Sequence, residues 1–172
     1  MPIQVPTHSC GYCDNFRGIL PPHGEPAVVH HDDHVYVILA PSSLGRMPGH
    51  TLVIPTRHVE TFLDLTDEET AQVAIMTRRV ATAIRDTFSP NGIHVQQHNG
   101  EAAWQTIPHV HFHVIPVMNY EDWPPDPENW IEVTPIDERK VQAALLASAL
   151  ASVPHLSDVV GHPPAQWYGC KL

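Results

Sequence analysis

Three histidines alternate with apolar residues in one short stretch of the chain. His109, His111 and His113 are separated by single residues within positions 108–116, which begin and end with proline. This alternation with β-branched and aromatic residues predicts a β-strand. Because side chains on a strand alternate between faces, the three imidazoles should project from one face at steps of roughly 7 Å. Solvated surface histidines are the plain alternative, but three titratable rings on a half-buried strand are costly unless they have a function.

The chemistry that such rings can perform is nucleophilic attack on phosphorus. A neutral imidazole is a nucleophile near pH 7, and a covalent intermediate divides one difficult displacement into two easier ones. A strand is rigid enough to hold the ring in line with the phosphorus atom. Just upstream, Asn99, Gln105 and Thr106 could donate hydrogen bonds to phosphoryl oxygens where charge develops. The alternative for each of these three residues is an ordinary role in a loop.

Two cysteines form a second group with possible chemistry. Cys10 and Cys13 form a Cys-x-x-Cys motif, while Cys170 stands alone near the C-terminus. An odd and low cysteine count argues against a disulfide framework and favours a metal or redox pair. A redox motif usually follows a strand and opens a helix, but no apolar strand precedes Cys10. We therefore prefer the interpretation that the two cysteines supply half of a zinc site, rather than a redox pair.

The elements that must position these residues are predicted from hydrophobic patterning. Residues 27–29 and 35–39 should form a hairpin around the polar residues 30–34, whose histidines are better explained by a solvated turn than by metal binding. Further strands are expected over residues 50–54 and 93–98, before the histidine strand. Residues 1–26 should be loop, with a short helical turn after Cys13.

Two helices complete the predicted fold. Residues 66–69, Thr-Asp-Glu-Glu, form a capping box, and the helix should run to about Phe88 with one apolar stripe facing the sheet. Thr134, Pro135 and Asp137 predict the start of a second helix that extends to about Val153. This order of elements indicates an α+β fold, with an antiparallel sheet of about five strands, a long helix packed on it and a C-terminal helical extension.

Composition limits the possible partners. The chain has 172 residues, a length that fits one domain, and a formal net charge of −10 without a basic patch. Nucleic acid and anionic membranes are therefore unlikely main partners. No apolar run approaches the roughly 18 residues of a membrane helix, and no signal-peptide pattern opens the chain, so the expected location is the cytoplasm.

Residues 109–115 resemble the histidine-triad (HIT) motif, in which three histidines alternate with apolar residues. The similarity extends to the Gly-His-Thr-Leu-Val-Ile-Pro stretch at residues 49–55, to the helix that follows, and to Asn99-Gly100 and Gln105-Thr106 before the triad. It covers roughly residues 10–117. The resemblance implies a HIT domain over residues 1–117 that includes an N-terminal zinc-binding segment. Residues 118–172 would form an extension packed on the same domain.

The resemblance implies an enzyme that cleaves nucleotides at the α-phosphate. His111 would be the nucleophile, forming a nucleotidyl-histidine that water hydrolyses, and His113 would contact the phosphate. Asn99, Gln105 and Thr106 would complete the phosphate cradle. The substrate would be a purine nucleotide, either a nucleoside phosphoramidate or a dinucleoside polyphosphate, and phosphate or a sugar phosphate could replace water in a transferase. Such proteins are usually homodimers joined around residues 66–98.

The same comparison implies a structural zinc ion. Its ligands would be Cys10, Cys13, His58 and His109, a closed tetrahedral set. His50 is the rival third ligand. His58 is preferred because it leaves the end of its strand with room to turn.

Three positions depart from the family pattern. The acidic or amide residue that usually meets the ribose hydroxyls aligns near Ser42, Trp104 replaces a common small residue, and Val117 replaces a common arginine. Two other functions stay open. One is a slow or non-catalytic nucleotide-binding regulatory protein of the same fold. The other is a metallohydrolase with an open metal site on the three triad histidines, which is disfavoured because no carboxylate lies nearby in the sequence.

Overall fold

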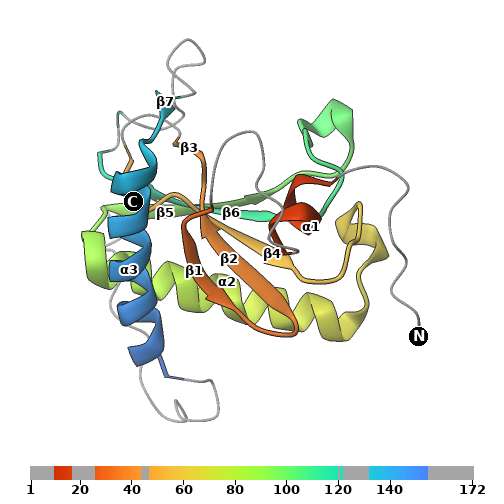
Figure 1. Ribbon diagram of the computed structural model, residues 1–172, viewed down its shortest axis with the longest axis horizontal. Helices are drawn as coiled ribbons and strands as arrows, with labels where there is room; N and C mark the ends of the chain where they lie inside the picture. The colour runs from red at the N-terminus through yellow and green to blue at the C-terminus, as the bar shows by residue number, and fades with distance from the viewer. Residues whose placement is uncertain (1–9, 17–25, 44–46, 120, 122–131, 155–172) are drawn as a thin grey trace, which may run out of the picture.

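A computed structural model describes residues 10–16, 26–43, 47–119, 121 and 132–154. Its centre is a five-stranded antiparallel sheet in the order β1-β2-β4-β6-β5 (Figure 1). The strands are β1 (Val28–His31), β2 (Val35–Leu39), β4 (Thr51–Pro55), β6 (Phe112–Val117) and β5 (Gly92–Gln97). The expected α+β fold with five antiparallel strands is therefore confirmed.

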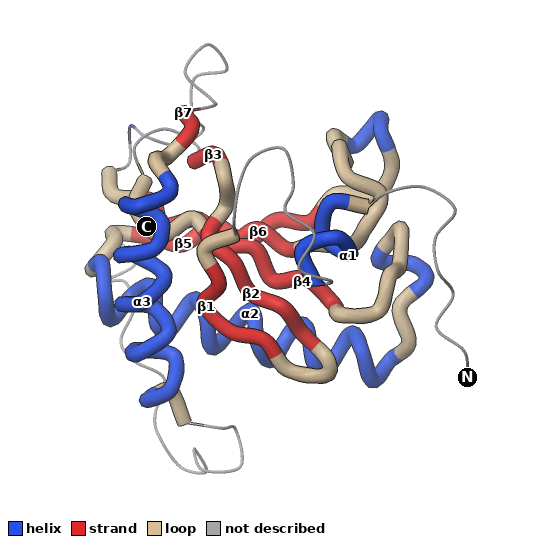
Figure 2. Tube along the Cα trace, viewed as in Figure 1, coloured by secondary structure: helices blue, strands red, loops and turns tan. Residues whose placement is uncertain are grey.

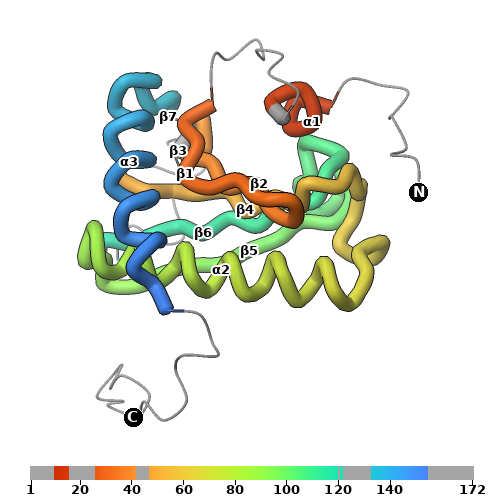
Figure 3. The backbone as a smooth tube through the Cα atoms, turned by 60° about the horizontal axis from the view of Figure 1, so that its bottom comes forward, coloured from red at the N-terminus to blue at the C-terminus, as the bar shows by residue number. Residues whose placement is uncertain are grey.

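Two layers cover the sheet. The long helix α2 (Asp67–Phe88) runs along one face and the short helix α1 (Gly11–Phe16) lies on the other (Figure 3). Every residue of β2 and β4 is buried, because alternate side chains enter two separate hydrophobic clusters. Val37 and Val53 join the cluster beneath α2 and α3, whereas Ile38 and Ile54 join the cluster that contains the residues of α1.

Helix α2 has the predicted boundaries for the predicted reason. The Thr66 hydroxyl accepts from the Glu69 amide, and the Glu69 carboxylate accepts from the Thr66 amide, so the capping box is complete. The helix ends where Ser89 adopts a left-handed conformation. Its buried stripe includes Val73 and Ile84, with apolar spacings of three and four residues.

The strand that carries the triad is shorter than predicted. Pairing begins at Phe112, so the expected strand was wrong for residues 109–111. Instead of joining a ladder, the Val110 amide donates to the Val59 carbonyl at 2.8 Å, and the His109 amide donates to the Ile107 carbonyl. A tertiary contact with the segment after β4 therefore replaces strand pairing at the first two histidines.

The C-terminal part of the described chain adds a helix and a small sheet. Helix α3 (Ile136–Ser152) packs against α2 and β1, close to its predicted bounds. Strand β7 (Glu132–Val133) pairs with β3 (Ser42–Ser43) apart from the main sheet (Figure 2). Helix α1 begins at Gly11, before the predicted start after Cys13. None of the described helices is long and apolar enough to cross a membrane.

Candidate active site and metal centre

Two cysteines and two histidines converge from three parts of the chain. The ligand atoms of Cys10, Cys13, His58 and His109 all lie within 4.8 Å of one another. The Nδ1 atom of His109 is 3.4 Å from the sulfur of Cys10, and Nδ1 of His58 is 3.3 Å from the sulfur of Cys13. Tetrahedral zinc with its usual bond lengths would place neighbouring ligand atoms roughly 3.3–3.8 Å apart. This cluster could therefore hold a metal ion.

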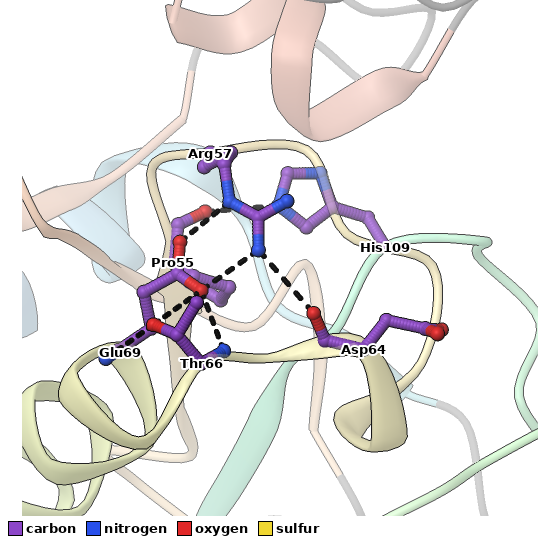
Figure 4. Close-up of polar contacts among 6 residues, drawn as sticks. All are labelled: Pro55, Arg57, Asp64, Thr66, Glu69 and His109. Carbon is purple, nitrogen blue, oxygen red and sulfur yellow. Dashed lines mark hydrogen bonds and ion pairs between the residues drawn. The ribbon is translucent and has the colours of Figure 1, made fainter.

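The outer contacts of His109 suit a metal ligand. Its Nε2 lies 2.9 Å from the Pro55 carbonyl (Figure 4), which can only accept, so this nitrogen carries the proton. The Nδ1 lone pair is then directed to the cysteines. The ring is fully buried, and burial is the main cause that lowers the pKa of His109 to about 4. The ring is neutral at pH 7, as metal binding requires.

An ion pair fixes the segment that carries His58. Arg57 donates from Nε and Nη2 to the Glu69 carboxylate at 2.5 and 2.7 Å, and Nη2 also reaches the Asp64 carbonyl (Figure 4). Glu69 is also the third residue of α2 and completes its capping box with Thr66. These hydrogen bonds, with that from Arg57 first, lower the pKa of Glu69 to about 2. The turn after β4 is thus tied to the N-terminus of α2.

A second cluster contains imidazoles only, and we call it the imidazole cluster. His113 lies at its centre, with ring centroids 4.9 Å from His111, 5.2 Å from His50 and 5.7 Å from His98. His50 Nε2 is 2.9 Å from His113 Nδ1, a distance at which one ring donates to the other. His50, the rival metal ligand, therefore lies with His113 and apart from the cysteines. Among the described residues, only Cys10, Cys13, His58 and His109, the Cys/His cluster, bring their ligand atoms close enough together to hold a metal ion.

His111 has the tautomer that a nucleophile at Nε2 requires. Its Nδ1 donates to the His109 carbonyl at 2.8 Å, so Nε2 of the neutral ring carries the lone pair. Burial lowers the pKa of His111, although the bond to the His109 carbonyl opposes this shift. The ring of Tyr12, from α1, stands edge-on to both His109 and His111.

The imidazole cluster is electrostatically neutral at its centre. Burial lowers the pKa of His113 to about 2, and the neighbouring His50, His111 and His98 act in the same direction. A proton on His113 would lose hydration and face three other rings that can also carry charge. The central ring is therefore uncharged at pH 7.

The amide residues predicted to cradle phosphate are engaged within the loop. Asn99 accepts from the Phe62 amide at 2.8 Å and donates to the Gln97 side chain. Gln105 accepts from the Gly100 amide and donates to the Glu60 carbonyl. Both amide side chains therefore hold the loop after β5 in shape.

Thr106 and Ser42 are the other two predicted substrate residues. Thr106 is exposed after this loop, and the backbone of Ser42 pairs with Val133 in the small sheet. His98 was not predicted as a site residue, yet its ring contacts His113 while its Nδ1 donates to the Ala103 carbonyl. Strand register could have indicated it. Gln96 lies opposite His113, and His98 follows two positions later on the same face.

The comparisons agree with this arrangement. A family model described as HIT domain matches residues 24–119, more than half of the chain, and the chain therefore belongs to the HIT family. The protein named Protein hit from Bacillus subtilis is 39% identical over 108 residues, which cover 63% of this chain and 70% of that protein. Adenosine 5'-monophosphoramidase hnt1 from Schizosaccharomyces pombe is 33% identical over 137 residues, covering 76% of this chain and 94% of the relative.

A solved structure is similar in fold. The crystal structure of a Zn-bound histidine triad family protein from Mycobacterium smegmatis has a TM-score of 0.66 and 31% sequence identity. The match covers 83% of this chain and 94% of that chain. A relative with bound zinc thus shares the fold in which the Cys/His cluster is found.

Proposed function

We propose that this protein is a nucleotide hydrolase that cleaves its substrate at the α-phosphate through a nucleotidyl-histidine on His111. The observation that carries the proposal is the bond from His111 Nδ1 to the His109 carbonyl, which leaves the Nε2 lone pair available in a buried, neutral ring. A phosphoramidase among the relatives supports the reaction class.

The reaction would proceed in two displacements. Nε2 of His111 attacks the α-phosphorus, a P–N bond to the ring forms, and the bond to the leaving group breaks. The leaving amine, phosphate or nucleotide takes up a proton as it departs. Water then cleaves the P–N bond, releases the nucleoside monophosphate and restores the neutral ring. His113, 4.9 Å from His111 between ring centroids, would contact the phosphate oxygens.

The preferred substrate is a purine nucleoside phosphoramidate, because the S. pombe relative is named for that activity. A dinucleoside polyphosphate is the second substrate class, since its α-phosphorus can be attacked by the same ring. In a transferase variant, phosphate or a sugar phosphate would take the place of water.

The Cys/His cluster is proposed as a structural zinc site. Two thiolates need a cation, and the cluster supplies four protein ligands, so a zinc ion there would be closed to substrate. Zinc bound in this way would neutralise the thiolates and crosslink α1 to the segments that carry His58 and His109. His109 would then be unavailable for acid–base chemistry.

A homodimer joined through α2 and β5 is also proposed. Strand β5 is the last strand of the sheet, so one of its backbone edges has no neighbouring strand among the described residues, and Val95 on it is 46% exposed. Light scattering after size-exclusion chromatography tests this assembly, and a monomeric mass at micromolar concentration would contradict it. The cytoplasmic location stays a prediction.

The proposed function is tested by intact-mass analysis after brief incubation with an adenosine phosphoramidate and quenching without acid. We expect a mass increase of one adenylyl group that is absent in His111→Ala. Substrate consumption without an adduct would reject His111 as the nucleophile and favour a metal-activated water. Nucleotide binding with neither adduct nor turnover would favour the regulatory binding protein.

A further inference from the structure

The C-terminal extension meets the candidate site at two points. Residues 132–152 lie beyond the part of the chain that matches the family model. The backbone of β7 pairs with β3, where Ser42 lies opposite Val133. In the second contact, the side-chain oxygen of Gln142, on α3 of the extension, accepts from the Gly49 amide at 2.8 Å. The extension thus binds the chain before β4 at two places, at β3, which lies beside β7 (Figure 1), and at Gly49.

Helix α3 holds Gln142 in a fixed place. Ala143, Leu146 and Leu150 are buried in the core cluster shared with α2 and the sheet. The Gln142 amide nitrogen donates to the Glu138 carboxylate at 3.0 Å. Because a carboxylate can only accept, this bond orients the amide so that its oxygen faces Gly49.

Gly49 itself has little freedom to move. Its φ of +88° favours glycine, and a Cβ atom there would overlap the Phe88 ring. The Gly49 carbonyl accepts from the Thr51 hydroxyl, and the His50 carbonyl accepts from the Ala40 amide. Three hydrogen bonds thus fix the backbone around His50, and the one on the N-terminal side comes from α3.

His50 transmits this placement to the imidazole cluster. Its side chain is buried, and its Nε2 lies 2.9 Å from Nδ1 of His113. The bond between the two rings determines which nitrogen of His113 carries the proton, and hence whether the opposite nitrogen donates to a phosphate oxygen. A small displacement of His50 would therefore change what His113 presents to a ligand.

We propose that the C-terminal extension is a working part of the nucleotide site, in which Gln142 is a positioning residue that sets the His50–His113 pair through the Gly49 amide. The kinetic consequence rests on the proposed function. The structural consequence, a change in the state of two rings, does not depend on turnover.

The decisive variant is Gln142→Met, which has a similar side-chain length but no acceptor. We expect the imidazole ¹⁵N signals of His50 and His113 to shift in long-range ¹⁵N–¹H spectra. We also expect kcat to fall by about tenfold, because the site needs sub-ångström positioning. The melting temperature should change by only a few degrees, since one partly buried hydrogen bond is lost.

Two matched variants separate positioning from a general effect on the helix. Glu138→Ala removes the bond that orients the amide but keeps the acceptor for Gly49, so it should change the imidazole signals and kcat less than Gln142→Met does. The double variant Glu138→Gln with Gln142→Glu keeps an acceptor for the Gly49 amide. It reverses only the bond between the two side chains, in which residue 138 would now donate to residue 142. It should keep the His50 and His113 signals and kcat at their wild-type values.

The proposal is overturned if Gln142→Met leaves both imidazole signals and kcat unchanged. It is also overturned if all histidine signals change together with a large loss of melting temperature, which would mean a structural role only. Gln142→Ala gives the same readouts if the methionine variant does not fold. Absence of turnover in the wild type would reject the proposed function, while the imidazole signals would still decide the role of Gln142.

Discussion

Two groups of histidines in this molecule lie close together and present opposite nitrogens. One is the candidate metal centre, formed by Cys10, Cys13, His58 and His109. In it, His109 donates to the Pro55 carbonyl through Nε2 and presents Nδ1 to two thiols. Two residues later, His111 bonds the His109 carbonyl through Nδ1 and keeps Nε2 for the site. The same side chain thus becomes a ligand or a candidate nucleophile, depending on which of its nitrogens a backbone carbonyl binds.

The partners of the two groups differ as well. The metal centre combines imidazoles with thiols, which become thiolates when they bind a cation. The imidazole cluster contains rings that contact one another, with His113 between His50, His98 and His111. Burial lowers the pKa of His111 and of His113, and a neutral ring retains its nucleophilic lone pair. One group is therefore suited to hold an ion, and the other to react with an anionic substrate.

The largest effect is expected where the imidazole cluster is broken. His111→Ala should lower turnover by about a thousandfold or more, because the covalent route is lost. Metal content should not change, since His111 is outside the metal centre. Steady-state kinetics with metal analysis measures both, and His34→Ala, in an exposed turn, is the control. Loss of metal together with turnover would show that the two groups are not separable.

Cys13→Ser should break the candidate metal centre. Losing one thiolate should release the metal and destabilise the fold by about 3 kcal/mol, or a melting temperature roughly 10 °C lower. Cys170→Ser, at a position outside the described residues, serves as the matched control. Metal stoichiometry and thermal unfolding provide the measurements. Retention of one metal ion per chain in Cys13→Ser would contradict the proposed ligand set.

A smaller effect is expected at Gly49, next to the imidazole cluster. Gly49→Ala places a methyl group against the Phe88 ring at a φ of +88°, which should cost about 2 kcal/mol. Adding Phe88→Leu should recover only part of this loss, because the backbone strain persists. Chemical denaturation of the single and double variants gives the two free energies. Metal content should stay at the wild-type value, and its loss would contradict the separation of the two groups.

The smallest effect concerns the ion pair beside the metal centre. Arg57 lowers the pKa of Glu69 to about 2 from its usual 4.5, so the folded state favours the ionised carboxylate. The resulting stability is present above pH 4.5 and is lost as the pH falls toward 2. Because Arg57 is exposed and Glu69 is only partly buried, solvent screens the pair, and this stability should amount to less than about 1 kcal/mol. The difference in unfolding free energy between wild type and Arg57→Gln should therefore disappear across this interval, and a constant difference would argue against the pair.

The fold could be predicted because its elements are encoded locally. The capping box at Thr66 and Glu69 and the apolar stripe of α2 need no knowledge of the rest of the chain. The start of β6 could not be predicted, because it depends on the bond between Val110 and Val59, which are distant in sequence. The alternating pattern is the same whether or not a ladder forms.

Some residues of the candidate site could be predicted from the sequence, and others could not. Cys10, Cys13, His58 and His109 were grouped from a family resemblance, and they lie together. His98 was missed and His50 was considered only as a rival ligand, because their proximity to His113 depends on strand register. Asn99 accepts from the Phe62 amide, a tertiary contact that the sequence does not reveal. Residue type alone therefore predicts a phosphate contact for Asn99.

The spacing of the metal centre along the chain also has a consequence for the order of folding. Cys10 and His109 are 99 residues apart, whereas the β1–β2 hairpin joins neighbours. Local pairs form early, but contacts between distant residues must wait until the intervening chain is ordered. The complete ligand set therefore exists only after the end of β4 has met the start of β6. Tight binding of the proposed zinc ion would therefore mark the completion of the fold rather than its nucleation.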